Sequence, residues 1–420
     1  MRYRWITTGL LVAAGLLTNP ATGRVQAQPL NSEPWELSGN DHPPVWAPIG
    51  TYQHDGSGVY TACEFILMHQ QRVLGNQPIA RRGFVDSAGL LTGTAGAFLG
   101  SGEVALTTEA LGRTGWSPGC RLTLGYRFEN GWNFSVSWLH LFDTKYSGGA
   151  GSQGPNFANP GQNLENNFLF APVFNFASEF TGPVARNTDA TGTIVFGDIN
   201  GIWNAATDMT ILYTQRFDNW DLAGRFPVFE TENARSYFMA GGRFSWIWER
   251  FQWRTVALGI DVTGVPAGAP PQLISQPDWA ARYINTLSQR MYGPFIGTGH
   301  EVMLYSGCGG SFGVGVECTG AILVDIAKER AKYIREDQAT QAKRSWVENE
   351  IVPNADLAVN LTWQPLEGLT FKVGWNLYNY FNTLVMRQPV GFNVGAIDPV
   401  YEKRFYRCLY GCNFGIGYTW

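Results

Sequence analysis

Apolar and polar residues alternate with a period of two in several segments of the chain, which is the pattern of β-strands. In residues 120–128, leucine and aromatic side chains fall on one face, and arginine, threonine and glycine fall on the other. Glu129-Asn130-Gly131 follows, and Asn-Gly accepts the positive φ angles of a tight hairpin turn. Residues 132–138 then repeat the alternation. These two segments therefore predict a β-hairpin.

The same alternation recurs along the rest of the chain. The further segments are 59–69, 209–217, 220–228, 238–246, 279–290, 294–305, 314–326, 357–363, 369–377 and 406–420. Asp218-Asn219 and Pro365 to Gly368 predict two more tight turns. Counting these segments gives about 12 antiparallel strands, and a further hairpin around residues 253–262 would make 14.

Alternation alone does not distinguish a soluble β-sandwich from a transmembrane barrel, because each has one apolar face. The connections favour the barrel: tight turns contrast with long polar stretches at about 70–116, 143–207, 327–352 and 381–405. Barrels have short turns at one end and long extracellular loops at the other, with aromatic residues near the strand ends. Residues 250–278 depart from this pattern, because a 12-strand count puts them on the short-turn side. We predict an all-β fold, a transmembrane antiparallel β-barrel.

The charged stretch from Lys328 to Asp337 follows one of the predicted strands. We expect a solvated loop there in preference to a short helix.

The N-terminus has the features of a secretory signal peptide. Arg2 and Arg4 precede an apolar run from Ile6 to Leu17, and a cleavage site follows at Ala27. About a dozen apolar residues are too few to cross a membrane, which needs about 20, and no later run reaches 18. We predict a signal peptide at 1–27, an extended periplasmic lead-in at 28–57 and the barrel at 58–420. The predicted location is the bacterial outer membrane, after cleavage of the signal peptide.

The low content of charged residues and the high content of aromatic residues agree with a protein surface that faces lipid. Only 15% of the 420 residues are charged, against about 25% in soluble domains, and 14% are aromatic. The net charge of -4 lacks the basic footprint of a nucleic-acid-binding protein. Outer-membrane lipid is therefore an expected partner and nucleic acid is not.

Several short segments resemble the beta-barrel porin-7 family of bacterial outer-membrane proteins. They are residues 59–67, residues 119–128 with Gly131-Trp132, residues 292–297, and the closing residues 417–420. The resemblance implies an outer-membrane barrel with a pore role and carries over no catalytic or ligand residues. The last strand ends on the aromatic Trp420, as is typical of outer-membrane barrels, so the barrel-assembly machinery is an expected partner through this strand.

Strand parity predicts which charged side chains face the barrel interior. The acidic residues are Glu64, Glu317, Asp325 and Asp356, and the basic ones are Arg121, Arg127, Arg216, Arg235, Arg243 and Lys372. A charge-lined interior selects ions, and the basic excess predicts a weak preference for anions. The alternative is that these charges pair across neighbouring strands and only satisfy the interior.

Six cysteines in an exported chain can form disulfides. Cys308 and Cys318 flank a glycine-rich hairpin and could pair. Cys63 lies in the first strand, and Cys408 and Cys412 lie in the last, so one of these pairs could close the barrel. Free lipid-facing thiols are the alternative.

Motifs for catalysis and cofactors are weak. Residues 309–313 match the G-x-S-x-G pattern of hydrolases, but in a predicted hairpin and not at the strand-to-helix turn that this chemistry needs. The five histidines lack metal-ligand spacing, and Asp198 with Asn200 lacks the rest of a calcium loop. We expect no enzyme activity, no metal and no cofactor.

The sequence therefore predicts a porin for passive diffusion of small polar solutes or ions. A non-conducting barrel that acts as a surface anchor or adhesion platform, presenting residues 143–207, is the first alternative. An outer-membrane hydrolase is the second. The oligomeric state is left open.

Overall fold

A computed structural model of the chain describes residues 58–86, 92–151, 168–175, 201–231, 233–257, 259–261, 272–274, 279–307, 310–338, 341–366 and 368–420. The chain divides into a short unit, Met1–Pro43, and a unit from Pro44 to Trp420 that contains every described residue. The predicted signal peptide and lead-in lie outside the described residues. Among the described helices, none is long and apolar enough to span a membrane.

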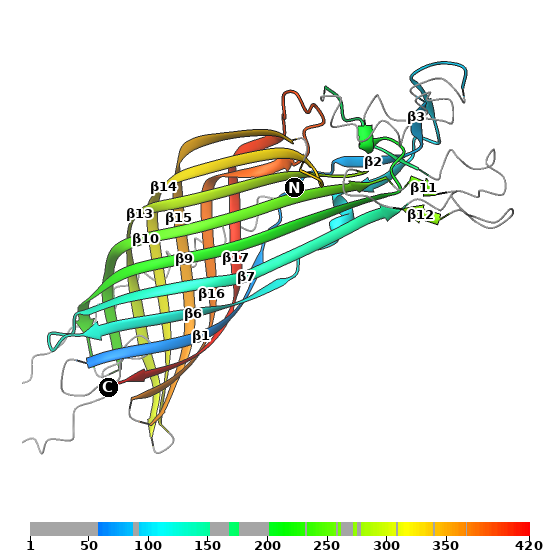
Figure 1. Ribbon diagram of the computed structural model, residues 1–420. Coiled ribbons are helices and arrows are strands. Elements are labelled where there is room, and N and C mark those ends of the chain that lie inside the picture. The colour runs from blue at the N-terminus through cyan, green and yellow to red at the C-terminus, as the bar shows by residue number, and fades with distance from the viewer. Residues whose placement is uncertain are drawn as a thin grey trace, which may run out of the picture. The chain divides into compact units, whose positions relative to one another are not determined.

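Ten antiparallel strands form a closed barrel (Figure 1). In ring order they are β1 (Gly58–Gln70), β17 (Val400–Thr419), β16 (Leu369–Gln388), β15 (Gln341–Leu366), β14 (Gly310–Arg335), β13 (Ala280–Gly307), β10 (Ala234–Val256), β9 (Asp208–Glu230), β7 (Asn133–Gly151) and β6 (Trp116–Arg127). The first strand pairs with both β6 and β17, which closes the ring. Closure removes the free strand edges that an open sheet would expose. The predicted transmembrane barrel class is confirmed.

The strand number is ten and not twelve, because two predicted pairs of strands are single long strands. β9 runs through Asp218 and Asn219 without a turn, and β13 runs through residues 290–294. The two polar residues stay in the strand because neighbours satisfy them: Asp218 lies 2.7 Å from His140 Nδ1, and Ser245 donates to Asn219 at 2.6 Å. With β9 continuous, residues 257–279 connect strands at the long-loop side, so the departure noted for 250–278 disappears.

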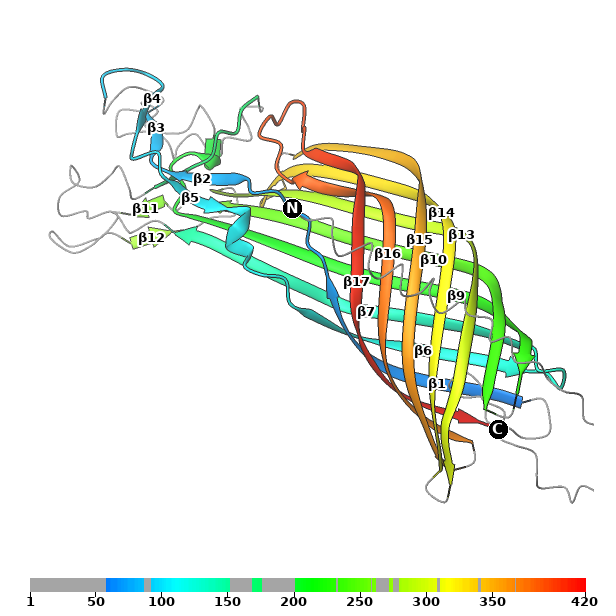
Figure 2. The same ribbon diagram turned by 180° about the vertical axis from the view of Figure 1, so that it is seen from behind.

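Short turns join β6 to β7, β9 to β10, β13 to β14 and β15 to β16 at one end of the barrel, which we call the short-turn end. At the other end, β14 and β15 also have a short connection, residues 336–340. The turn at residues 128–132 has Gly131 at a φ of 79°, and the turn before β16 has Gly368 at 77°. These two tight turns were predicted correctly. The backbone N–H of Trp420 donates to Val59 O, so the C-terminus lies at this end beside the start of β1, as Figure 2 also shows.

The opposite end, the long-loop end, carries several small elements. They are β2 (Pro78–Arg82), β3 (Phe84–Asp86), β4 (Ala97–Leu99), β5 (Val104–Thr107), β8 (Leu169–Phe170), β11 (Gly259–Asp261), β12 (Gln272–Ile274), and the short helices η1 (Thr108–Leu111) and η4 (Gly201–Trp203). Strands β5, β2 and β8 form one small sheet. In Figure 1 these elements continue beyond the barrel strands.

Residues 327–352 belong mostly to strands, against the prediction of a long loop. β14 continues to Arg335 and β15 begins at Gln341. The prediction of a solvated loop or helix at 328–337 was wrong because charge was taken as a sign of a loop. Inward Ala331 and Tyr333 are buried, whereas the lysines and Arg330 between them point outward. The alternation continues beyond the apolar part of the strand.

The outward face carries a broad belt of exposed apolar side chains. Leu124, Ile296 and Ile322 keep 57%, 62% and 65% of their surface exposed. Aromatic rings pack against one another within the belt, as where Trp138 stacks on Trp220 with centroids 5.5 Å apart. A soluble protein seldom exposes so much contiguous apolar surface, and a barrel in lipid requires it.

Candidate functional site

The interior of the barrel gathers nine of the ten charged residues that parity assigned to it. Arg216 is the exception: it points outward, donates to both carboxylate oxygens of Asp143, and lies over the rings of Trp246 and Trp248. The prediction failed because the inward face of β9 is mostly apolar along residues 209–217, so parity assigned its two faces the wrong way round. Met209, Ile211, Tyr213 and Phe217, which parity placed toward lipid, point inward and are buried.

A polar chamber of about 130 Å³ lies in the half of the barrel near the short-turn end. At roughly 10–15 Å³ of such volume per molecule, it has room for about ten waters. On one wall, Glu64 accepts from Arg121 at 3.3 Å, from Lys372 at 3.4 Å, and from Asn413 at 2.7 Å. Its three partners come from three different strands, β6, β16 and β17. The side chain of Glu64 is only 3% exposed.

A second group lies on strands β9, β10, β13 and β14. Tyr237 donates to Glu317 at 2.6 Å and contacts Glu301 at 3.2 Å, while Arg225 Nε lies 3.5 Å from Glu317. The phenol hydroxyl thus bridges two carboxylates, which would otherwise repel each other in a confined space. The carboxylate of Glu317 is thus stabilised by two partners, Tyr237 and Arg225.

A third group closes the top of the chamber around Arg243. Its guanidinium donates to both oxygens of Asp221, at 2.7 and 3.1 Å, to Asn354 at 2.6 Å, and to Asp356. A planar guanidinium suits such multiple pairing better than an ammonium does. The geometry fixes Arg243 between β9 and β15.

The charges that line the chamber pair with one another. Four cations, Arg121, Arg225, Arg243 and Lys372, face five acids: Glu64, Asp221, Glu301, Glu317 and Asp356. The predicted basic excess is therefore absent from the chamber, and with it the reason for an anion preference. The alternative that charges pair across strands describes the interior better.

Three predicted interior residues lie outside the chamber wall. Arg127 and Arg235 lie near the short-turn end, and Arg235 donates to Gly131 O of the adjacent turn at 3.3 Å. Asp325 is 1% exposed and lies at the other side of the chamber, farther along β14.

Above the chamber, toward the long-loop end, apolar side chains from around the ring meet in the interior. We call this group the apolar layer: Ile66, Met68, Leu139, Leu141, Phe217, Ile247, Met291, Leu323, Val352, Tyr378, Tyr380 and Leu409. Ile66, Phe217, Ile247, Met291 and Leu323 have no exposed surface. Close packing of this kind leaves few voids larger than a water molecule.

An ion pair lies directly beyond the apolar layer. Arg407 donates to both carboxylate oxygens of Glu249, at 2.6 and 2.7 Å, and both side chains are at most 2% exposed. Gln215 donates to Glu249 as well, at 3.2 Å. Because each charge would be costly to bury alone, the two residues depend on each other.

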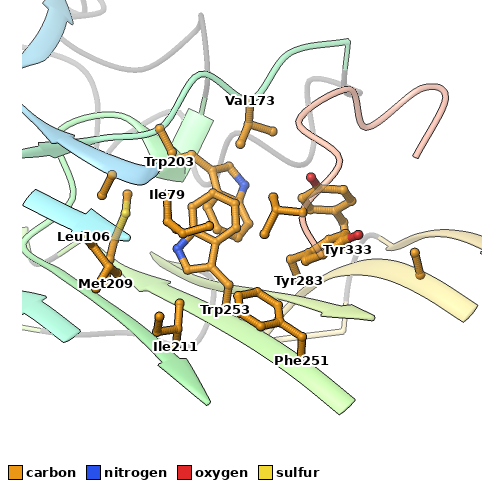
Figure 3. Packing of buried hydrophobic residues seen from close by; sticks show 14 of the residues in the cluster. Ile79, Leu106, Val173, Trp203, Met209, Ile211, Phe251, Trp253, Tyr283 and Tyr333 are labelled. Carbon is orange, nitrogen blue, oxygen red and sulfur yellow. The ribbon is translucent and has the colours of Figure 1, made fainter. Parts of the chain in front are cut away.

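The long-loop end of the interior is filled by a second apolar group, the upper core (Figure 3). Barrel residues such as Phe251, Trp253 and Tyr283 meet loop residues there, and the ring centroid of loop residue Trp203 lies 4.0 Å from that of Trp253. Loop residues Ile79, Leu106, Leu111, Leu169, Val173, Val390, Val394 and Ile397 are also buried in it. The loops therefore enter the barrel and form part of its core.

Sequence reasoning did not identify Asp221, Arg225, Glu249, Glu301 or Arg407. A signal for two of them was available. Trp220 and Leu222 mark the outward face of residues 220–228, and Asp221 and Arg225 have the opposite parity, so the alternation of that segment places both inward. The pairing of Glu249 with Arg407 joins positions 158 residues apart and has no local signature.

The five described cysteines, Cys63, Cys120, Cys318, Cys408 and Cys412, carry free thiols. Cys63 lies opposite Ile416, and Cys412 lies opposite Leu67. The offset of four residues separates Cys63 from Cys412 by about 13 Å, too far for a disulfide, and Cys408 is farther still. A disulfide that closes the barrel is therefore not formed. Cys308 lies outside the described residues.

The hydrolase-like motif and the histidines do not form a catalytic arrangement among the described residues. Ser311 lies in β14, and its hydroxyl donates to Gln364 at 3.3 Å. His300 Nδ1 lies 2.7 Å from Ser236 Oγ on the outward face, with no carboxylate bonded to the other ring nitrogen among the residues that the structure describes. Within the same residues, no group of His, Cys, Asp and Glu can hold a metal ion. His42, His54, Asp198 and Asn200 lie outside the described residues.

Comparison with known proteins gives one family match. The family model described as Legionella pneumophila major outer membrane protein precursor matches residues 105–418, about three quarters of the chain. No curated protein matches the chain. The porin-7 likeness and this match both concern bacterial outer-membrane proteins.

Among solved structures, the outer membrane protease OmpT from Escherichia coli is 10% identical, with 86% of this chain and 97% of that chain covered and a TM-score of 0.37. A Pseudomonas aeruginosa FadL homologue is 9% identical, with 87% and 90% covered and a TM-score of 0.21. The P. putida toluene transporter TodX is 9% identical, with 87% and 90% covered and a TM-score of 0.20.

Proposed function

The chain belongs to the Legionella pneumophila major outer membrane protein family and is a bacterial outer-membrane β-barrel, and from this premise we propose that it is a closed barrel that carries a rigid loop assembly at the cell surface. The short turns of such barrels face the periplasm and the long loops face outward. The polar chamber is then periplasmic, and the upper core lies at the extracellular side.

The observation that carries this proposal is the double apolar seal above the chamber. The apolar layer and the upper core are two successive groups of buried side chains in the path of a solute. An ion that crosses them would lose its hydration without gaining compensating partners, and even a wide hydrophobic constriction excludes water. A polar solute in the chamber therefore meets a barrier.

The loops support the second half of the proposal. Trp203, Ile79 and Leu106 are at most 2% exposed and fix loop segments onto the barrel wall. Main-chain bonds add to this attachment: Leu169 and Ala206 each donate to the other's carbonyl oxygen, at 2.8 and 2.9 Å. A surface held in this way is preorganised for contact with a partner.

Passive diffusion of small polar solutes is the second candidate, and the chamber favours it. The side chains of Asp221 and Glu317 keep 19% and 23% of their surface exposed, so solvent reaches the chamber. Diffusion through the barrel would require displacement of the upper core and of the apolar layer. With four cations against five acids in the chamber, such a pore would have no anion preference.

We propose no catalytic reaction for this chain. Among the described residues, Ser236 and His300 form a serine–histidine pair, and a lipid-hydrolysis assay with the refolded protein tests whether this pair is catalytic. Release of fatty acid that disappears in Ser236→Ala would favour an enzyme.

A liposome-swelling assay tests the closed barrel. Vesicles that contain the refolded full-length chain should swell in small sugars no faster than empty vesicles, while vesicles with a general diffusion porin swell rapidly. Rates that rise with the amount of this protein and fall with sugar size would instead establish diffusion.

Surface display needs its own experiment. A peptide epitope inserted at Ser101, which is exposed in the long-loop assembly, should bind antibody on intact cells. Binding that occurs only after the outer membrane is permeabilised would contradict the proposed orientation.

A further inference from the structure

Six cations gather on the outward face of the barrel toward the long-loop end. We call them the outer cation cluster: Arg250, Arg290, Lys328, Arg330, Lys332 and Lys343. Strand register brings them together: Arg250 and Arg330 both pair with Thr286 of β13, from opposite sides. Neighbouring strands lie about 4.8 Å apart and alternate residues about 7 Å apart, so the group forms one patch.

Within the cluster, like charges lie side by side. Lys332 of β14 lies directly opposite Lys343 of β15. The charges of Arg250, Arg330 and Lys343 all act on the Lys332 ammonium group. Like charges opposite each other destabilise a sheet, so this arrangement calls for an anion from outside the chain.

Among the described residues, no carboxylate forms an ion pair with any of these six cations, and Asp143, whose charge acts on Arg250 from a distance, is paired with Arg216. On the outward face, residues 246–254 of β10, 282–292 of β13, 322–334 of β14 and 343–351 of β15 include no carboxylate. Asp143 is bonded to Arg216 at one edge of the patch. At the other edge, Glu336 accepts from Arg254 at 2.5 Å and from Arg282 at 2.8 Å, and these hydrogen bonds hold the pKa of Glu336 below its usual range.

The height of the cluster identifies the kind of anion. Lys328 follows the outward residues Val324 and Ile326 on β14, and Val324 is 52% exposed. On β10 the side chains of Trp246 and Trp248 lie at the same height, with Arg290 over the first ring at 5.6 Å and Arg250 over the second at 4.7 Å. Tryptophan at the end of an apolar belt marks the membrane–water interface. The cations thus begin where the lipid head groups begin.

We propose that the outer cation cluster binds the phosphate groups of a phosphorylated glycolipid in the outer leaflet, whose acyl chains lie along the apolar belt below. Basic residues close to a membrane surface contribute about 1 kcal/mol each toward anionic lipid. The guanidinium groups can pair with phosphate through two N–H donors, and the rings of Trp246 and Trp248 hold two of them in place. A soluble polyanion would not reach Arg290 and Lys328, which lie at the level of the head groups.

Native mass spectrometry of the refolded full-length chain in detergent, with diphosphoryl lipid A as the probe, tests the proposal. The triple variant Lys328→Gln/Arg330→Gln/Lys332→Gln should raise the Kd at least about ten-fold, since three cations are lost. The matched control is Arg387→Gln/Lys403→Gln/Arg404→Gln, which removes the same charge from exposed positions on β16 and β17. Its Kd should stay within about two-fold of wild type, because solvent screens its charges.

Measurements on the wild-type protein decide the question even if a variant fails to fold. Raising the salt from about 0.05 M to about 0.5 M should weaken binding of diphosphoryl lipid A, and a dephosphorylated form should bind at least about ten-fold more weakly. Equal binding of the dephosphorylated lipid, or an equal loss in the control variant, would overturn the proposal. Displacement of the lipid by an equal concentration of inorganic phosphate would show a free-anion site and would also overturn it.

Discussion

At the scale of single residues, the interior is governed by how each buried charge is satisfied. Glu249 and Arg407 are at most 2% exposed and form a two-point ion pair. Neither has a local sequence signature, whereas Glu64, Arg243 and Glu317 were predictable from parity alone. Alternation reveals which face a side chain occupies, but it does not reveal its partner across the barrel.

The Glu249 and Arg407 pair yields a prediction for stability. Arg407→Met leaves a buried carboxylate unpaired and should lower the free energy of unfolding by about 3–5 kcal/mol. The double variant Glu249→Leu/Arg407→Met removes both charges and should recover most of that loss. Urea unfolding in micelles measures both. A double variant no more stable than the single one would show that the pair is not the source of the effect.

Gly125 offers a second prediction, because a side chain there would meet the ring of Tyr60. A Cβ on Gly125 would lie 2.2 Å from the nearest ring carbon, and the Tyr60 hydroxyl donates to Asn133 at 2.7 Å. Gly125→Ala should therefore lower the free energy of unfolding by about 1–3 kcal/mol. The control is Gly242→Ala, whose Cβ would have no atom within 4 Å. We expect a change within about 0.5 kcal/mol there, and similar values for both would contradict the steric account.

At the scale of the elements, the sequence predicted the hairpin turns and the outward faces well and the strand lengths poorly. Alternation in residues 120–138 and 357–377 identified both strands and the turn of two hairpins, but only part of the length of their strands. It failed at Asp218-Asn219, because turn-forming residues can lie inside a strand when cross-strand partners satisfy them. It also failed at 327–352, because above the membrane the outward face becomes charged while the inward face becomes apolar, so the strand continues with its polarity reversed.

The burial of Trp203 predicts what holds the loops in place. Trp203 of η4 has no exposed surface and contacts Trp253 and Tyr333. Trp203→Ala should lower the local stability of the loop assembly by about 3–5 kcal/mol and make its loops sensitive to protease. The barrel should keep its heat-modifiable mobility on gels. Phe174→Ala, at a position that is 48% exposed, is the control and should stay resistant. Equal protease resistance in all three proteins would mean that the upper core does not anchor the loops.

At the scale of the whole molecule, the described interior consists of a polar chamber, an apolar layer, an ion pair and an upper core. The barrel class, its outer-membrane context and nine inward charges followed from the sequence. The contents of the interior did not, because the loop residues that fill it have no periodicity that links them to the barrel. A charged lining suggested a pore, but pairing within the chamber and packing above it favour a closed barrel.

Conductance across a planar lipid bilayer tests the closed barrel most directly. After insertion of the refolded full-length chain, verified by its heat-modifiable mobility, the current in about 1 M KCl, where the Debye length is only about 3 Å, should stay at the level of the bare bilayer. Occasional brief openings would be consistent with transient displacement of the loops. Stable, uniform steps in current under the same conditions would contradict the account and establish the barrel as an open pore.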